Sequence, residues 1–444
     1  MVRSKIISLP CVNGIYLADN LKRMFEEEER RLSPYAFPSR KATRINDYLR
    51  DWPHAVIKSN SIENGTDPYT MPFVIDATMA KLSSVYSRLG GKAMSISSIL
   101  HPHDLVSNRL THVGAAAIIG MRLAEALCLN VMLVVAALEI HDVGQPPFGH
   151  AGEEAFSSLC KDHDIPYTLR EGERQRIVDF SHPAQSFRIL AELEEGNMGL
   201  NLIVQTLDAA LCHNKQDFHQ RFTFNPQKTP EMLLQQYHNA YTIKGTMSAP
   251  IPMTLEGCVV KVADIISYIG KDPIDGIRIG LITRDDIPEE TLDILIKLNK
   301  HERLMDLSLD EINRRITNTI INDIIEQSYG QPYIEMSRPI YEAVKKTRTF
   351  IYQKINPDRA NESRGQIKDI VNKLFEIYLD DIEMNNKKSS IFTTFLNKKH
   401  SNYIHFMPPK RIVIDHLVGM TDAYFIEEYK KRTIPRLGRD FIAR

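Results

Sequence analysis

One short stretch of the chain, Glu139–Glu153, reads EIHDVGQPPFGHAGE and brings His141, Asp142, His150 and Glu153 close together in sequence. The stretch begins at the end of a nearly unbroken apolar run, from Val131 to Ile140, whose composition predicts a buried helix. Imidazole and carboxylate groups are rarely buried unless they are hydrogen-bonded, paired with an opposite charge or bound to a metal. We therefore interpret this stretch as the floor of an active site.

Four side chains of metal-ligating type lie on apolar helical segments or at their ends. They are His112, His141, Asp142 and Asp264. Mixed histidine and aspartate ligands suit Mg, Mn, Fe, Co, Ni or Zn ions. Neighbours on a regular helix cannot point the same way, but a chain that turns at a helix end lets His141 and Asp142 converge. A single histidine is more often a hydrogen-bonded core residue, so the hypothesis of a divalent-metal site depends on the joint pattern.

His150 and Glu153 are three residues apart at the predicted start of a helix, after Pro146, Pro147 and Gly149. This spacing places both side chains on one helix face, where a carboxylate can orient an imidazole for general acid–base catalysis. The alternative is structural, because the helix dipole favours a glutamate in the first turn. The spacing alone leaves both interpretations open.

A polar stripe recurs every four residues in a third segment, at Asp264, Tyr268 and Asp272. Residues four apart share one helix face, so the stripe is either a partly wet helix edge or the wall of a polar pocket. Because proline disfavours α geometry in the residue before it, Pro273 predicts that Asp272 sits just beyond the helix end.

The segments that must position these side chains are almost all helical in pattern. We predict helices over residues 73–89, 110–129, 153–160, 182–194, 200–212, 255–271, 289–304, 308–328, 339–354, 364–382 and 411–431. Residues 216–253 show no clear period, and 384–403 are predicted to form a surface loop. Since few segments alternate with period two, the predicted fold class is all-α.

The composition of the chain limits which binding partners and which cellular compartment we expect. The 444 residues are 43% hydrophobic and 25% charged, with a net charge of -1, which gives no global electrostatic argument for nucleic acid or an anionic membrane. The five cysteines are scattered without paired spacing, which favours a reducing compartment. No signal peptide or membrane-length apolar run is evident, so we expect a soluble cytoplasmic protein without a membrane partner.

The motifs resemble those of the HD-domain phosphohydrolases and, more narrowly, the dGTP triphosphohydrolase family of dNTPases. The segments that carry the resemblance are RLTH at 109–112, HDVGQPPFGHAGE at 141–153 and ADIISY at 263–268. Further matches are SRL at 87–89 with Lys92, HPAQSFRIL at 182–190 and DHLVGMTDAY at 415–424. The resemblance covers residues from about 70 to 430 and implies an HD-domain fold with helical additions.

The resemblance implies a role for each motif residue. It makes His112, His141, Asp142 and Asp264 the ligands of a divalent metal, Mn²⁺ or Mg²⁺ before Fe, Co, Ni or Zn. The residues it implies for the chemistry at the α-phosphate are His150, Glu153 and His182. The substrate contacts it implies are Arg109, Tyr268, Asp272, Arg88 and Lys215. Of these, Arg109 would contact phosphate, Tyr268 the deoxyribose and Asp272 the 3′-hydroxyl.

The implied reaction converts a deoxynucleoside triphosphate (dNTP) and water into a deoxynucleoside and inorganic triphosphate. The resemblance also implies a homo-oligomer, from dimer to hexamer, and a dNTP or single-stranded DNA remains possible as an effector. Together with the length of the chain, the resemblance implies an N-terminal segment over 1–70 packed on the core, an HD catalytic domain over 71–285 and a C-terminal helical region over 286–444 that is continuous with it.

Two positions depart from the family pattern. Lys215 is the nearest lysine to the place where many members carry a phosphate-binding one, and Gln145 replaces a histidine of some relatives. Both changes leave the hydrolytic core intact and bear on base selectivity and phosphate binding. Two other functions stay open. One is an HD-type hydrolase of another nucleotide, and the other is a nucleotide-sensing or nucleic-acid-binding protein that has kept the pocket.

Overall fold

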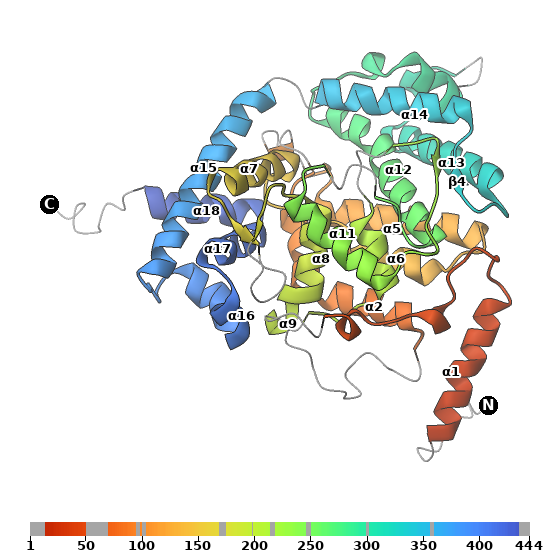
Figure 1. The fold of residues 1–444 in the computed structure, drawn as a ribbon. Coiled ribbons are helices and arrows are strands. Elements are labelled where there is room, and N and C mark those ends of the chain that lie inside the picture. The colour runs from red at the N-terminus through yellow and green to blue at the C-terminus, as the bar shows by residue number, and fades with distance from the viewer. Residues whose placement is uncertain are drawn as a thin grey trace, which may run out of the picture.

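The fold is described from a computed structural model. The structure describes residues 14–49, 70–94, 98–99, 104–167, 175–197, 199–213, 218–245, 250–298, 302–355 and 359–434. Within these ranges the chain is predominantly helical, with two antiparallel two-stranded sheets (Figure 1). The predicted all-α fold class is confirmed.

The helices of the first two thirds of the chain are α1 (Gly14–Glu29), α2 (Pro72–Leu82), α3 (Ser84–Arg88), α5 (Arg109–Ala126), α6 (Val131–Ile140), α7 (Gly149–Asp162), α8 (His182–Arg188), α9 (Glu194–Asn197), α10 (Val204–Leu211), α11 (Pro230–Thr242) and α12 (Leu255–Arg278). Those that follow are α13 (Leu309–Ser328), α14 (Arg338–Phe350), α15 (Arg359–Glu383), α16 (Ser401–Phe406), α17 (Pro409–Val418) and α18 (Asp422–Thr433). Four π-helical turns add η4 (Ile189–Leu193), η7 (Thr291–Ile296), η9 (Ile351–Ile355) and η10 (Ile391–Phe395).

The strands are short. Strands β1 (Pro166–Tyr167) and β2 (Gln175–Arg176) pair with each other, and β3 (Arg221–Phe222) pairs with β4 (Ile334–Glu335). The second pair joins the segment after α10 to the segment after α13, two parts of the chain that are far apart in sequence. The two sheets therefore connect loop segments to each other and do not form the core.

Helices α5, α6 and α12 form the centre of the molecule, where α5 packs against both of the others (Figure 1). A polar side chain caps the start of each: Asn108 for α5, Asn130 for α6 and Thr254 for α12. Gly120 of α5 permits close approach to α6, since a Cβ there would lie 2.4 Å from Leu138 Cδ1. These close contacts hold the three helices that carry the metal-type side chains.

Two hydrophobic clusters flank this centre. One joins α7, α8, α10 and α11 to α15 and α17, and the other joins α12, α13 and α14. Buried residues of α5 and α6 contribute to both clusters. In Figure 1 α15 and α17 lie on the left with α16 and α18, α8 and α11 lie near the centre, and α13 and α14 lie at the upper right. The candidate site forms where the two groups meet.

Several predictions of secondary structure require correction. Helix α12 continues through Pro273 to Arg278, so Asp272 lies inside it and not beyond its end. Buried packing of Pro273 and Ile274 compensates for the backbone hydrogen bond that the proline removes. Residues 216–253 contain α11, and the single helix predicted over 411–431 is two, α17 and α18.

Further differences concern boundaries. Residues 384–403, predicted as a loop, include η10 and the start of α16. Helix α7 begins at Gly149, four residues before the predicted start, so His150 and Glu153 both lie in its first turns. None of the helices in the described ranges is long and apolar enough to cross a bilayer.

Candidate metal centre and substrate pocket

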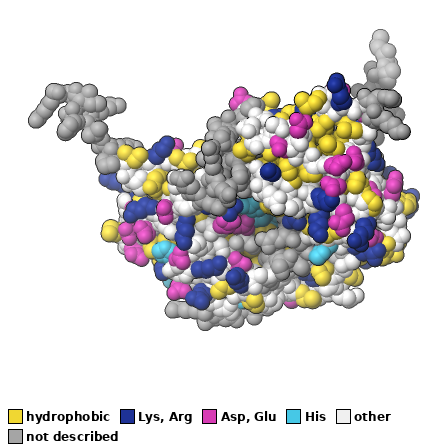
Figure 2. All heavy atoms as spheres, turned by 90° about the horizontal axis from the view of Figure 1, so that it is seen from above, with side chains coloured by type: hydrophobic (Ala, Val, Ile, Leu, Met, Phe, Trp, Pro, Cys, Tyr) yellow, Lys and Arg dark blue, Asp and Glu magenta, His cyan; other side chains and the backbone are white. Residues whose placement is uncertain are grey.

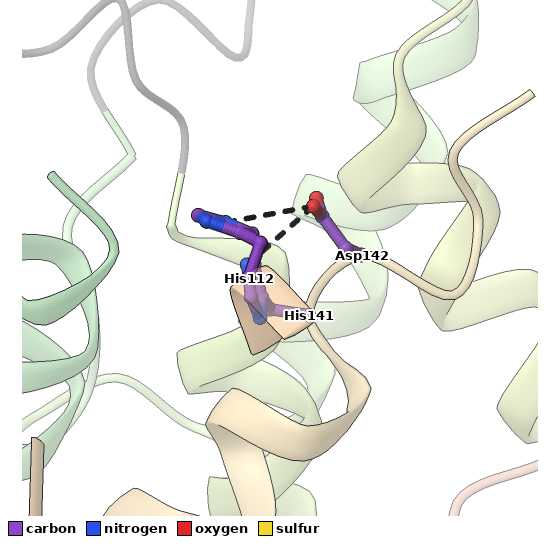
Figure 3. Close-up of side chains that lie close together, drawn as sticks. All are labelled: His112, His141 and Asp142. Atoms are coloured by element: carbon purple, nitrogen blue, oxygen red, sulfur yellow. Dashed lines mark ion pairs between the residues drawn. The ribbon is translucent and has the colours of Figure 1, made fainter. Parts of the chain in front are cut away.

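Three helices bring the four predicted metal ligands together. His112 comes from the first turn of α5, His141 and Asp142 follow the last residue of α6, and Asp264 comes from the middle of α12. His112 Nε2 lies 3.0 Å from Asp264 Oδ1 and 3.8 Å from Asp142 Oδ2. His141 Nε2 lies 3.6 Å and 3.7 Å from the same two oxygens. Figure 3 shows His112 and His141 directed toward the carboxylate of Asp142.

Hydrogen bonds behind the cluster set the tautomers of both histidines. His141 Nδ1 lies 2.6 Å from the carbonyl oxygen of Leu138, which can only accept, so Nδ1 carries the proton. Ser267 Oγ donates to the carbonyl of Asp264 at 2.6 Å and lies 3.1 Å from His112 Nδ1, which therefore donates to it. Each neutral ring thus directs the lone pair of Nε2 toward the two carboxylates, the arrangement typical of metal-binding imidazoles.

The donor set fits a divalent cation. Potential ligand atoms of His112, His141 and Asp142 lie within 4.8 Å of one another, and all four side chains are almost fully buried. Burial alone would lower the pKa of His141, but the negative charges of Asp142 and Asp264 outweigh it and raise that pKa. The centre therefore favours positive charge, and a bound cation would supply it in place of protons.

His213, to which the sequence analysis gave no role, lies at the same centre. Its Nε2 is 3.0 Å from His182 Nε2 and 3.8 Å from Asp142 Oδ1. Burial and the neighbouring His141 and His182 hold its pKa well below the usual range, so the ring is neutral. Its position directly after the apolar segment 200–212 resembles that of His141 after α6, and this likeness was the signal available in the sequence.

Glu153 orients two histidines at once. Its Oε1 accepts from the backbone N–H of His182 at 2.8 Å and lies 2.9 Å from His182 Nδ1, while its Oε2 lies 3.4 Å from His150 Nδ1. Burial opposes ionisation of Glu153, yet His182 and His150 hold its pKa well below the usual range. The carboxylate is therefore charged and links His150 to the metal-type cluster through His182.

The predicted substrate residues are only partly brought together. One pocket is lined by side chains from α5, α7, α12 and η9, namely Arg109, His150, Tyr268, Asp272, Ile351 and Tyr352. Figure 2 shows histidine and acidic side chains at the bottom of a hollow on this face of the molecule. Arg88 instead lines a separate cavity with Lys399, and its Nη1 donates to the carbonyl of Gly419. Lys215 lies outside the described residues.

Arg109 connects the pocket to the metal-type cluster. Its Nη1 donates to Asp142 Oδ2 at 2.6 Å, and both side chains are buried. Its Nε and Nη2 donate to the carbonyls of Ala93 and Met94, each at 3.3 Å, so the guanidinium has a defined orientation. The positively charged guanidinium of Arg109 contacts the metal-type cluster and also lines the pocket. It is therefore placed to bind an anionic group that lies between them.

The loop after α6 is held against α8 at very short range. Ser186 Oγ accepts from the N–H of Gly144 at 2.9 Å and donates to the carbonyl of His141 at 2.7 Å. A Cβ on Gly144 would lie 2.1 Å from the backbone nitrogen of Ser186, so only glycine permits this contact. The contact brings the start of α8, and with it His182, next to the cluster.

Two domain descriptions match the chain. The HD domain model matches residues 109–269, and the phosphohydrolase-associated domain model matches residues 334–431. The first match lies within the predicted 71–285 region and the second within the predicted C-terminal region. The chain therefore contains an HD domain followed by a phosphohydrolase-associated domain, and the resemblance seen in the sequence is confirmed. HD domains bind divalent metals.

Three similar proteins each have the name deoxyguanosinetriphosphate triphosphohydrolase-like protein. The relative from Desulfatibacillum aliphaticivorans is 28% identical over 94% of this chain and 98% of its own. The relative from Caldanaerobacter subterraneus subsp. tengcongensis is 28% identical over 75% and 76%, and that from Caulobacter vibrioides is 27% identical over 81% and 89%. A crystal structure of a hypothetical protein from Aquifex aeolicus covers 81% of this chain at 16% identity, but its TM-score of 0.35 is too low to support an argument.

Proposed function

We propose that the protein hydrolyses deoxynucleoside triphosphates to the deoxynucleoside and inorganic triphosphate, using one or more divalent metal ions. The observation that carries the proposal is Arg109, which pairs with Asp142 of the metal-type cluster while it lines the pocket that also contains His150, Tyr268 and Asp272. The relatives' shared name supports the same reaction.

The buried charges suit a polyanionic substrate. A divalent cation held by His112, His141, Asp142 and Asp264 would polarise a phosphoryl oxygen and offset charge at phosphorus. Mn²⁺ is the cation we propose first, because the resemblance implies Mn²⁺ or Mg²⁺ and two imidazoles depart from the nearly all-oxygen coordination that Mg²⁺ prefers. Arg109 would contact the α-phosphate, since its guanidinium already faces both the cluster and the pocket.

We assign proton transfer to the departing oxygen to His150. Water oxygen bonds to the α-phosphorus, the bond from that phosphorus to the 5′ oxygen breaks, and the departing oxygen needs a proton. The side chain of His150 is 43% exposed and lines the pocket, while its Nδ1 faces Glu153, and we assign the proton transfer to its imidazole. Proton transfer by a positioned imidazole typically contributes about 10²–10⁴-fold to the rate.

The opposite wall of the pocket would hold the sugar. Tyr268 and Asp272 are one turn apart on α12 and line the pocket together. The ring of Tyr268 against C2′ would exclude a 2′-hydroxyl by steric contact, and the carboxylate of Asp272 would accept a hydrogen bond from the 3′-hydroxyl. These two contacts would select deoxyribose and place the 5′ oxygen toward His150.

The test is a panel of the four dNTPs with Mn²⁺, Mg²⁺, Co²⁺ or Ni²⁺, in which deoxynucleoside, orthophosphate, pyrophosphate and triphosphate are separated. We expect equal amounts of deoxynucleoside and triphosphate from the wild type and at least a 10²-fold lower rate from Asp264→Asn. Asp310→Asn, at a side chain that is 88% exposed on α13, is the control and should keep the wild-type rate.

Other products would overturn the proposal in defined ways. Release of orthophosphate would identify a phosphohydrolase of another nucleotide. A dNTP that binds in the presence of each metal without turnover would identify a nucleotide sensor. Repeating the panel with a second dNTP or single-stranded DNA would reveal an effector through the loss of a lag phase.

A further inference from the structure

Three segments that are far apart in the sequence meet beside the pocket. They are residues 91–94, residues 145–148 of the loop after α6, and residues 418–422 at the junction of α17 and α18. The first and the third contain Lys92 and Asp422, which belong to motifs for which the proposed reaction has no use. Both side chains are buried, so their contacts with the second segment require an explanation.

The carboxylate of Asp422, in the first turn of α18, binds both of the other segments. Its Oδ1 accepts from the backbone N–H of Phe148 at 2.9 Å, and its Oδ2 accepts from the backbone N–H of Ala93 at 2.8 Å. Phe148 and Ala93 both lie outside the helices. Each oxygen of this buried carboxylate therefore stabilises irregular backbone, and the two pieces of backbone belong to different segments.

The bond to Phe148 fixes the start of α7. Phe148 directly precedes this helix with a φ of +68°, in the left-handed region that residues other than glycine rarely adopt. Its ring packs edge-on against Phe425 of α18, with 5.3 Å between the ring centroids. Asp422 and Phe425 thus hold in place a residue of unfavourable conformation that lies two positions before His150.

The bond to Ala93 leads to Arg109. The carbonyls of Ala93 and Met94 accept from Nε and Nη2 of Arg109, and the backbone N–H of Arg109 donates to the carbonyl of Lys92 at 2.9 Å. Asp422 therefore binds the N–H of the same residue whose carbonyl orients the guanidinium. A shift of this segment would change the direction in which Arg109 faces the pocket.

Lys92 joins the three segments a second time. Its Nζ donates to the carbonyl of Gln145 at 2.5 Å and to that of Val418 at 3.0 Å. Beside it, a Cβ on Gly91 would lie 2.6 Å from Cγ2 of Thr421, so the backbone there approaches the start of α18 closely. Two buried side chains of opposite charge thus hold the same three pieces of backbone together.

We propose that Asp422 is a positioning residue for dNTP hydrolysis, which places Arg109 for the α-phosphate and His150 for the departing oxygen. Asp422 lies in the match to the phosphohydrolase-associated domain, whereas Arg109 and His150 lie in the match to the HD domain. The C-terminal region is then required for the geometry of the pocket. This inference rests on the proposed function, because that function gives Arg109 and His150 their roles.

Hydrogen–deuterium exchange of the full-length chain, resolved to single residues by mass spectrometry, tests the link without substrate. We expect slow exchange at the amides of Ala93 and Phe148 in the wild type, since both donate to Asp422. An amide side chain offers one acceptor oxygen in place of two. Exchange should therefore rise at one of these amides in Asp422→Asn and at both in Asp422→Ala, while exchange in α12 stays at the wild-type level.

The kinetic test compares two buried aspartates. Because a misplacement of about 1 Å can cost about 10²-fold in rate, kcat of Asp422→Asn should fall roughly 10- to 100-fold with its manganese content unchanged. Asp76→Asn is the matched control, since Asp76 is fully buried in α2, accepts from the backbone N–H of Ile203 at 2.8 Å and does not line the pocket. It should lower the melting temperature and keep the wild-type kcat.

A second background separates positioning from a general loss of stability. In His150→Gln one of the groups that Asp422 positions is already absent, so adding Asp422→Asn should cost at least about threefold less in kcat than it does in the wild type. Asp76→Asn should have the same small effect in both backgrounds. Circular dichroism at the assay temperature establishes that each variant is folded.

Three results would overturn the positioning role of Asp422. They are fast exchange of both amides in the wild type, a wild-type kcat in Asp422→Asn, and equal losses of kcat in the two backgrounds. The proposed reaction fails separately. Absence of triphosphate release by the wild type, together with exchange that rises only at Ala93 and Phe148 in the variants, would refute that reaction and leave the hydrogen-bonded link in place.

Discussion

Glu153 and His182 are joined twice, since Oε1 of Glu153 accepts from the backbone N–H and faces Nδ1 of the same histidine at 2.9 Å. The carboxylate thereby ties the start of α8 to the first turns of α7, two segments that only the fold brings together. Its other oxygen faces His150. One side chain thus orients both the histidine beside Asp142 and the histidine that lines the pocket.

The first prediction concerns this carboxylate. Glu153→Gln keeps the shape of the side chain but removes the charge that orients both imidazoles, so we expect kcat for dNTP hydrolysis to fall about 10- to 100-fold. KM should stay within about two- to threefold of the wild type, because Glu153 lines no part of the pocket. Glu154→Gln, one residue further along α7 and 57% exposed, should leave both constants unchanged. A change in KM alone would contradict the assignment of Glu153 as a positioning residue.

The second prediction tests the sugar contact at Asp272. A hydrogen bond to a charged group contributes about 1.5–3 kcal/mol, so the wild type should hydrolyse a dNTP with roughly 10- to 150-fold higher kcat/KM than its 3′-deoxy analogue. In Asp272→Ala the rate for the dNTP should fall to the level of the analogue, and the two substrates should become equivalent. Preference for the 3′-hydroxyl that survives in the variant would assign that contact to another residue.

The third prediction concerns the packing that places His182. In Gly144→Ala the added methyl would meet the backbone of Ser186 at 2.1 Å, so α8 must move away from the loop after α6. Overpacking of this kind costs about 1–3 kcal/mol, and displacement of His182 should also lower kcat. We expect a lower melting temperature together with reduced hydrolysis and reduced manganese content.

Gly114→Ala is the matched control for that substitution. Gly114 lies in α5, and a Cβ there would meet nothing within 4 Å. An alanine in a helix interior is favoured over glycine by about 1 kcal/mol, so this variant should melt at the same or a higher temperature. Equal destabilisation of the two variants would show that the close contact between Gly144 and α8 does not limit stability.

The sequence anticipates the metal-type cluster because the residue types are unusual for their surroundings. His141 and Asp142 stand at the end of an apolar helix, and Asp264 stands inside another. Burial of such polar side chains costs free energy unless they are paired or bind a metal, so their positions indicate a site. His213 likewise stands just after the end of a buried helix, α10, but only the fold shows that it faces His182. Convergence of four helix ends and one helix middle depends on long-range packing that no local pattern contains.

Other differences also have physical causes. The buried face of α11 carries Leu233, Tyr237, Ala240 and Tyr241, which keep a helical period, but tyrosines count weakly as apolar and the surrounding residues are polar. Pro273 stops an isolated helix, whereas burial against a neighbouring layer carries α12 past it. Arg88 shares a motif with the site residues, yet α3 places it at the carbonyl of Gly419, away from the pocket.

The last prediction concerns stability and pH, through Glu256 in the first turn of α12. Its Oε1 accepts from the backbone N–H groups of Phe37 and Asn130 at 2.9 and 3.0 Å, and the side chain is fully buried. Burial raises its pKa to about 7 from the ordinary value of 4.5, although those hydrogen bonds act in the opposite direction. The folded protein therefore retains a proton that the unfolded chain releases.

The sign of the effect follows from that retained proton. The stabilisation is fully present below about pH 4.5, declines as the pH rises and is lost above about pH 7, a total of about 3 kcal/mol. Glu256→Gln binds no proton, so its unfolding free energy should fall less between pH 5 and pH 8 than that of the wild type. Glu231→Gln, at the same position of the first turn of α11 but exposed, should follow the wild-type curve. Parallel curves for the wild type and Glu256→Gln, measured by urea unfolding, would show that Glu256 is ionised in the folded protein throughout this range.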